Sequence, residues 1–192
     1  MNRRLFATAA SVVLLEGFSA MAESAPIRSL EKISGRGFQA IQSVIDLLQR
    51  RRPELYDDRL DVLQAGQQEV VLLTPPPTPI GGRPIGALVQ PPRDLTGDEM
   101  QLLLSRLGQM QSLGSLEARH YPVLQRGVTV FAQRGLDLGA YQIQLVSEGA
   151  TLAVLFADRT REPGTKGSTG QPGFEVVFDA ADLSVLRANF VR

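Results

Sequence analysis

The segment YQIQLVSEGATLAVLFA, residues 141–157, carries the clearest structural pattern in the chain. Over its first five residues apolar side chains alternate with glutamines, which is typical of a strand with one buried face. The Glu-Gly pair at 148–149 predicts a tight turn, and the more apolar run 151–157 then returns as a second strand. This segment is therefore expected to form an antiparallel hairpin.

Outward from this hairpin, the C-terminal half reads as one helix followed by four antiparallel strands. A Gly/Pro/Thr-rich loop over 158–173 leads to the apolar segments 174–178 and 185–191, which predict a last hairpin. Before residue 141, Pro122 is of the type favoured at a first helical position, and Gly135 ends the expected helix. Its buried face is expected to carry Leu124, Val128 and Phe131.

The N-terminal half begins with another helix, which we expect over residues 34–51. Its apolar residues recur at helical spacing: Phe38, Ile41, Val44, Ile45 and Leu48. The three arginines at 50–52 complement the helix dipole at its C-terminal end, and a phosphate or acidic-partner site is the alternative. Branched apolar segments at 59–63 and 69–73, either side of Gly66, predict a hairpin after this helix.

A Pro/Gly-rich stretch over residues 74–92 is interpreted as a surface loop or hinge, in which only 85–89 could form a short strand. A helix is expected to start at Thr96, because Thr96 and Glu99 form a capping box and Leu95 can contact Met100. An apolar face is predicted to continue through Leu103, Leu104, Leu107 and Met110.

These elements predict an α+β fold in which helices pack on one face of a curved antiparallel sheet. We expect a single domain over residues 23–192. Within it, three parts can be distinguished: a helix–hairpin unit over 26–74, a Pro/Gly-rich loop over 75–93, and helices plus a four-stranded meander over 94–192.

The chain also resembles itself at a shift of 83 positions, and we call this similarity the internal echo. Ile41 falls on Leu124, Leu60 on Ile143, and the turn glycine Gly66 on Gly149, with no gap. Two related helix–hairpin units would explain the match. Chance would also explain it, as would the topology shared by any helix followed by a hairpin, and we favour these explanations over duplication.

The N-terminus resembles an export signal. Arg3 and Arg4 precede an apolar run over residues 5–15, and Ala20-Met21-Ala22 matches a signal-peptidase site. We therefore expect residues 1–22 to be a signal peptide, with a buried N-terminal helix as the alternative. The paired arginines also resemble a twin-arginine signal. The mature protein is expected in the periplasm or secreted, without a transmembrane anchor.

Composition excludes several classes of function. The 192 residues include 20 basic and 20 acidic side chains, a balance that argues against binding nucleic acid. Cysteine is absent, so disulfides, thiol chemistry and cysteine-ligated metals are excluded, and the core must form from apolar residues, which make up 43%.

The sequence contains no recognisable catalytic motif. His120 is the single histidine, so a zinc or copper site would need an unusual set of oxygen ligands, and we expect no metal site and no cofactor. The segment 164–168 has the composition of a phosphate-binding loop, but its lysine and serine are separated by a glycine and a strand is expected to follow. We therefore reject a nucleotide site there.

The helix followed by a four-stranded meander over residues 121–192 resembles the cystatin-like superfamily, which includes nuclear-transport-factor-like domains. The segment Gln144–Gly149 is similar to the Q-x-V-x-G segment of cystatin inhibitors, with one extra residue before the glycine. The ending, residues 172–192, resembles the tails of small exported bacterial proteins of unknown function. These resemblances imply a fold and a location and no activity.

The expected function is non-catalytic binding of a protein, peptide or small ligand in the cell envelope, at the concave face of the sheet and its rim loops. The candidate binding residues are His120, Tyr141, Arg159, Arg161 and Lys166. One alternative is a small enzyme whose acid–base groups, such as His120, Tyr141 or a loop carboxylate, sit in that concavity. The other is an immunity or protease-inhibitor-like protein.

Overall fold

The structure is a computed structural model that describes residues 27–53, 57–76, 82–159 and 171–191. The expected signal peptide, residues 1–22, lies outside the described residues, as do Arg161 and Lys166. In the part of the chain that is described, no helix has the length and apolar character needed to cross a membrane.

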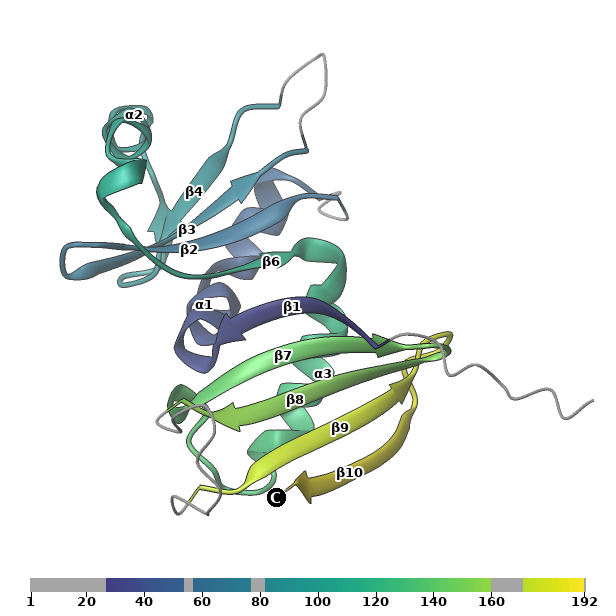
Figure 1. The fold of residues 1–192 in the computed structure, drawn as a ribbon. Helices are drawn as coiled ribbons and strands as arrows, with labels where there is room; N and C mark the ends of the chain where they lie inside the picture. The colour runs from purple at the N-terminus through teal and green to yellow at the C-terminus, as the bar shows by residue number, and fades with distance from the viewer. Residues whose placement is uncertain (1–26, 54–56, 77–81, 160–170, 192) are drawn as a thin grey trace, which may run out of the picture.

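A single antiparallel sheet organises the described residues (Figure 1). Its ten strands lie in the order β10-β9-β8-β7-β1-β6-β2-β3-β4-β5. In chain order they are β1 Arg28–Ser34, β2 Arg59–Ala65, β3 Gln68–Thr74, β4 Ile85–Leu88, β5 Arg93–Asp94, β6 Gln111–Glu117, β7 Tyr141–Glu148, β8 Thr151–Asp158, β9 Gly173–Asp179 and β10 Val185–Val191. The expected α+β class is therefore correct, with strands as the larger part.

Two of the helices, α1 (Gly35–Arg51) and α3 (Tyr121–Ala132), pack on one face of the sheet and enclose the main core. The third helix, α2 (Gly97–Ser105), packs on the opposite face. There it covers a smaller cluster of Leu63, Val70, Leu72, Leu88 and Leu103. Leu63, Val70 and Leu72 alternate along β2 and β3 with the residues that face α1. Their side chains therefore lie on the other side of the sheet. The expectation that all helices lie on one face is wrong for α2.

The predicted C-terminal order is confirmed, because α3 is followed by β7, β8, β9 and β10 in one antiparallel meander. Phe131, at the end of α3, stacks on Phe156 with ring centroids 4.3 Å apart and meets Tyr141 edge to face at 4.9 Å. Aromatic packing of this kind fixes the helix against the strands that follow it.

In the N-terminal half, the structure agrees with the prediction for α1 and for the β2–β3 hairpin. Ser34 caps α1 by accepting a hydrogen bond from the amide of Gly37, and Arg51 is its last residue. The short strand β4 is the one that the Pro/Gly-rich stretch was expected to allow at 85–89. The helix expected through Met110 already ends at Ser105, and Leu104 and Leu107 are exposed where burial was expected.

Strands β1 and β6 were not predicted, although they occupy the centre of the sheet. Their sequences, RSLEKIS and QSLGSLE, carry few apolar residues, and β6 includes a glycine. Neither sequence shows the alternation or the apolar run that marks a strand. Their strand conformation is determined by the neighbouring strands, because each pairs on both sides.

The shift of 83 positions corresponds to a structural repeat. It carries β1 onto β6, β2 onto β7 and β3 onto β8. The pairing of β1 with β7 has the same register as that of β6 with β2, and both contain an irregularity at matching positions, Leu30 and Leu113. The echo is therefore not chance: two units of common topology exchange their first strands.

Candidate functional site

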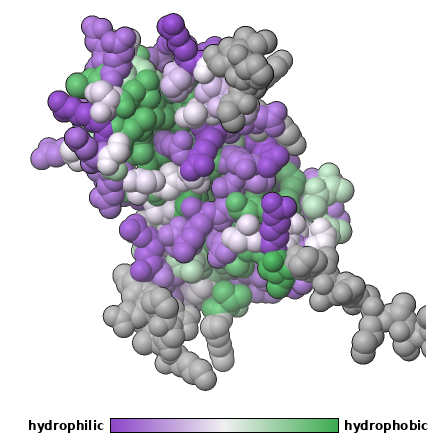
Figure 2. Space-filling model, turned by 45° about the horizontal axis from the view of Figure 1, so that its top comes forward, coloured by the Kyte–Doolittle hydropathy of each residue, from purple (hydrophilic) through white to green (hydrophobic). Residues whose placement is uncertain are grey.

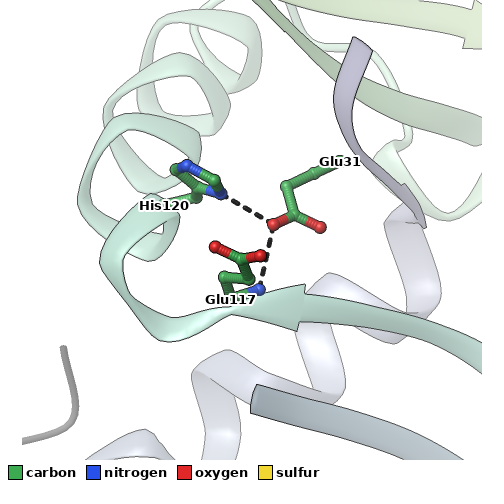
Figure 3. A group of neighbouring side chains, drawn as sticks. All are labelled: Glu31, Glu117 and His120. Carbon is green, nitrogen blue, oxygen red and sulfur yellow. Dashed lines mark hydrogen bonds and ion pairs between the residues drawn. The ribbon is translucent and has the colours of Figure 1, made fainter. Parts of the chain in front are cut away.

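The start of β1 and the end of β6 lie side by side and bring three ligand-type side chains together (Figure 3). Glu31 belongs to β1, Glu117 is the last residue of β6, and His120 immediately precedes α3. Glu31 lies on the helix-facing side of the sheet, because Ile33, two residues further along the strand, is a core residue.

The carboxylate of Glu31 organises this cluster. Its Oε1 atom accepts a hydrogen bond from the backbone amide of Glu117 at 3.0 Å and lies 2.7 Å from Nδ1 of His120. The side chain of Glu31 is 9% exposed and that of His120 is 15% exposed. A carboxylate can only accept, so Nδ1 carries the proton in this hydrogen bond.

Glu117 completes the cluster with a more exposed side chain. It forms an ion pair with Arg119 on the turn that leads into α3. Ligand atoms of Glu31, Glu117 and His120 all lie within 4.8 Å of one another. One imidazole nitrogen and two carboxylates in this arrangement can hold a divalent cation or exchange protons.

A cavity of about 760 Å³ adjoins the cluster and has a mixed charged lining. Its acidic residues are Glu31, Asp57 and Glu117, and its basic residues are Lys32, Arg59 and Arg119. The guanidinium of Arg59 is already engaged, since it donates to Asp61 at 2.8 Å and to Ser115 at 3.0 Å. The cavity is therefore lined by charged side chains of both signs, of which Arg59 is already paired.

A second cavity, of about 650 Å³, lies between the end of α1, strand β4 and helix α2, and we call it the α2 groove. Its walls are mainly apolar and include Ile85, Leu95, Met100 and Leu104. Arg51 and Arg83 stand at its edge, and Arg51 forms an ion pair with Asp94 at 3.0 Å.

Three leucines on or just after α2 are exposed, and one of them belongs to the lining of the α2 groove. Leu102 is 53% exposed, and Leu104 and Leu107 are 39% and 38% exposed. Figure 2 shows hydrophobic side chains gathered on the upper left of the molecule, the end at which α2 lies in Figure 1. Of these three leucines Leu104 alone lines the α2 groove, so it is the one that an apolar ligand bound there would cover.

The predicted site residues that the structure describes, His120, Tyr141 and Arg159, do not form one site. Tyr141 is 1% exposed and packs on Phe131 at the end of α3, whereas His120 precedes the start of that helix, about 16 Å away at 1.5 Å per residue. The hydroxyl of Tyr141 donates to the carbonyl of Pro172 at 3.1 Å. Burial, and then the charge of Asp158, raise the pKa of Tyr141 above its ordinary value.

Arg159 lies beside Tyr141, because its amide donates to the carbonyl of Ala140. The remaining predicted site residues, Arg161 and Lys166, fall in the undescribed segment 160–170. The arginines that end α1 are engaged: Arg50 donates to the Asp46 carbonyl, and Arg51 and Arg52 pair with Asp94 and Asp58.

Sequence reasoning missed Glu31 and Glu117. Glu31 is separated from His120 by 89 positions, and both glutamates belong to the strands that were not recognised. No local motif connects residues so far apart. The internal echo does not point to them either, because it aligns Glu31 with Gly114 and Glu117 with Ser34.

Comparison of the chain with protein-family models, with curated proteins and with solved structures finds no match.

Proposed function

We propose that this protein is a non-catalytic binding protein of the cell envelope, and that the α2 groove binds a ligand with an apolar body and an acidic group. The observation that carries the proposal is the lining of the groove. Apolar walls formed by Ile85, Met100 and Leu104 adjoin the cationic side chains of Arg51 and Arg83. Binding sites of this kind combine apolar burial with a few charged groups that orient the ligand.

The apolar walls supply the favourable free energy of binding. Burial of apolar surface contributes roughly 25 cal/mol per Å², so a ligand that covers the apolar walls of the groove gains several kcal/mol before the costs of association. Leu104 lines the groove and is still 39% exposed. The guanidinium of Arg83 is the group best placed to pair with an acidic ligand, because Arg51 is already paired with Asp94.

The groove is held in shape by the start of α2. Thr96 and Glu99 form the expected capping box, and Glu99 also accepts two hydrogen bonds from Arg93, at 2.6 and 2.8 Å. Gly86 of β4 lines the groove beside the start of α2. A Cβ atom there would come within 2.8 Å of Leu95 and Met100, so glycine allows β4 to approach the helix closely.

The test uses two amphiphilic anions as probes: 1-anilinonaphthalene-8-sulfonate, followed by fluorescence, and dodecanoate, followed by calorimetry. We expect saturable binding of one molecule per chain. Leu104→Gln should weaken it about tenfold, because it removes apolar burial worth more than 1 kcal/mol. Leu102→Gln changes a more exposed leucine of the same helix outside the groove lining, and should leave the affinity unchanged.

The charge of the ligand is tested by Arg83→Gln, with Arg106→Gln as the matched control outside the groove. We expect weaker binding of both anions in the first variant only. Absence of saturable binding, or equal effects of the groove and control substitutions, would contradict the proposal.

Export of the protein and a cystatin-like fold, both expected from the sequence, also stay proposals. The export of the protein rests on residues 1–22, and a cystatin-like fold is supported by the order α3, β7, β8, β9 and β10. The alternatives of a small acid–base enzyme and of an immunity or inhibitor-like protein stay predictions.

A further inference from the structure

We propose that Glu31, Glu117 and His120 form a binding site for a divalent transition metal of the zinc class. The proposal is independent of the α2 groove, which involves none of these residues. It rests on the donor types, on their arrangement, and on the contrast between the two units of the repeat.

The donor set selects a class of metal. An imidazole nitrogen with two carboxylate oxygens suits Zn²⁺ and its neighbours in the first transition series, whereas Mg²⁺ and Ca²⁺ prefer oxygen ligands alone. Zinc sites with three protein ligands keep a fourth position for water or another ligand. The charged cavity beside Glu31 and Glu117 provides the space for that position and a route from solvent.

The three ligands need only small movements to coordinate one ion. Two ligands bound to tetrahedral Zn²⁺ are about 3.4 Å apart, given bonds of about 2.1 Å. The Glu31 Oε1 and His120 Nδ1 atoms, 2.7 Å apart, must separate slightly, and the carboxylate of Glu117 must approach. The side chain of Glu117 is 47% exposed, so it can leave Arg119 and turn towards the ion.

Binding replaces the proton that His120 shares with Glu31. In the metal-free protein Nδ1–H donates to the carboxylate. When the metal binds Nδ1, the neutral imidazole carries its proton on Nε2, and an imidazolium releases one proton to solvent. No oxidation or reduction is involved.

The equivalent junction in the other unit of the repeat is built from different residues. The shift of 83 positions places Glu31 on Gly114, Glu117 on Ser34 and His120 on Gly37. At that equivalent junction, Ser34 caps α1 through the Gly37 amide and donates to the carbonyl of Leu113 at 3.0 Å. One junction is therefore built from small residues, whereas the other gathers a histidine and two glutamates. The topology that the two junctions share therefore does not dictate these residue types.

The experiment is titration of the purified protein, prepared without a polyhistidine tag, with ZnCl₂ and separately with MgCl₂ by calorimetry. We expect one Zn²⁺ per chain and no Mg²⁺ binding in the same range. Glu117→Gln and His120→Gln should each weaken zinc binding by at least about tenfold. Glu148→Gln, at an exposed glutamate at the C-terminal end of β7 that does not belong to the cluster, is the matched control and should bind zinc as the parent does.

A second readout is thermal unfolding, because zinc would join β1 to the start of α3. Zinc should raise the Tm of the parent and of Glu148→Gln, and should leave the Tm of His120→Gln unchanged. Glu117→Gln keeps the test valid if His120→Gln folds poorly, since the Glu117 side chain is half exposed. Failure of the parent to bind zinc at submillimolar concentration, or zinc binding that neither site variant weakens, would overturn the proposal.

Discussion

Lys32 of β1 and Ser115 of β6 lie directly opposite each other at the centre of the sheet, and they are the same position in the two units of the repeat. An antiparallel pair of equivalent residues implies a local twofold axis between them. On either side of this axis β1 pairs with β7 and β6 pairs with β2. Each unit therefore completes its sheet with the first strand of the other unit.

The strand exchange predicts that the two halves need each other. We expect fragments 1–107 and 108–192, produced together, to associate as a one-to-one complex, because β1 and β6 find their partners only across the break. The break falls in an exposed turn at Leu107 and Gly108. Light scattering after size-exclusion chromatography measures the mass, and two separately folded monomers would contradict the prediction.

Gly114 is predicted to be sensitive to substitution, because its φ of 134° is one that other residues rarely adopt. A Cβ atom there would also lie 2.8 Å from Cγ1 of Ile33, in the central strand pair. Gly114→Ala should lower the free energy of unfolding by about 1–3 kcal/mol. Gly108→Ala, where no atom lies within 4 Å of the added Cβ, is the control, and urea denaturation compares the two.

Phe131 is predicted to be a main contributor to stability. It is fully buried and contacts the rings of Tyr141, Phe156 and Phe174. Phe131→Ala should cost about 3–5 kcal/mol. Phe190 meets Phe174 at 5.2 Å but is 53% exposed, so Phe190→Ala should cost only about 1 kcal/mol. Equal losses in chemical denaturation would show that the aromatic cluster is not the centre of the core.

Glu99 should make the protein more stable above pH 4.5 than at lower pH. Hydrogen bonds from Arg93 and then from the Thr96 amide lower its pKa from 4.5 to about 2. The folded state therefore favours the carboxylate, and this contribution is complete above the ordinary pKa and lost as the pH falls from 4.5 towards 2.

Glu99→Gln should flatten this part of the stability profile, measured as Tm from pH 2 to pH 6. Asp98→Asn, at the neighbouring exposed position of α2, is the control. An unchanged acid profile in Glu99→Gln would rule out Glu99 as its source.

Local patterns in the sequence were enough to predict the elements that are stabilised by interactions between residues close in sequence. The capping box of Thr96 and Glu99, the spacing of apolar residues in α1 and α3, and the meander after Tyr141 each depend on neighbours within a few positions. Interactions between residues close in sequence can be recognised from the sequence itself. The structure therefore has these elements within a few residues of the predicted bounds.

Only the tertiary structure determined the centre of the molecule. Strands β1 and β6 are polar in sequence and become strands because other strands supply hydrogen-bond partners on both sides. The proximity of Glu31 to His120, and the α2 groove, follow from that pairing and from the packing of α2 on the second face of the sheet. A contact between residues almost ninety positions apart, such as Glu31 and His120, leaves no local pattern in the sequence, because it forms only when the whole chain has folded.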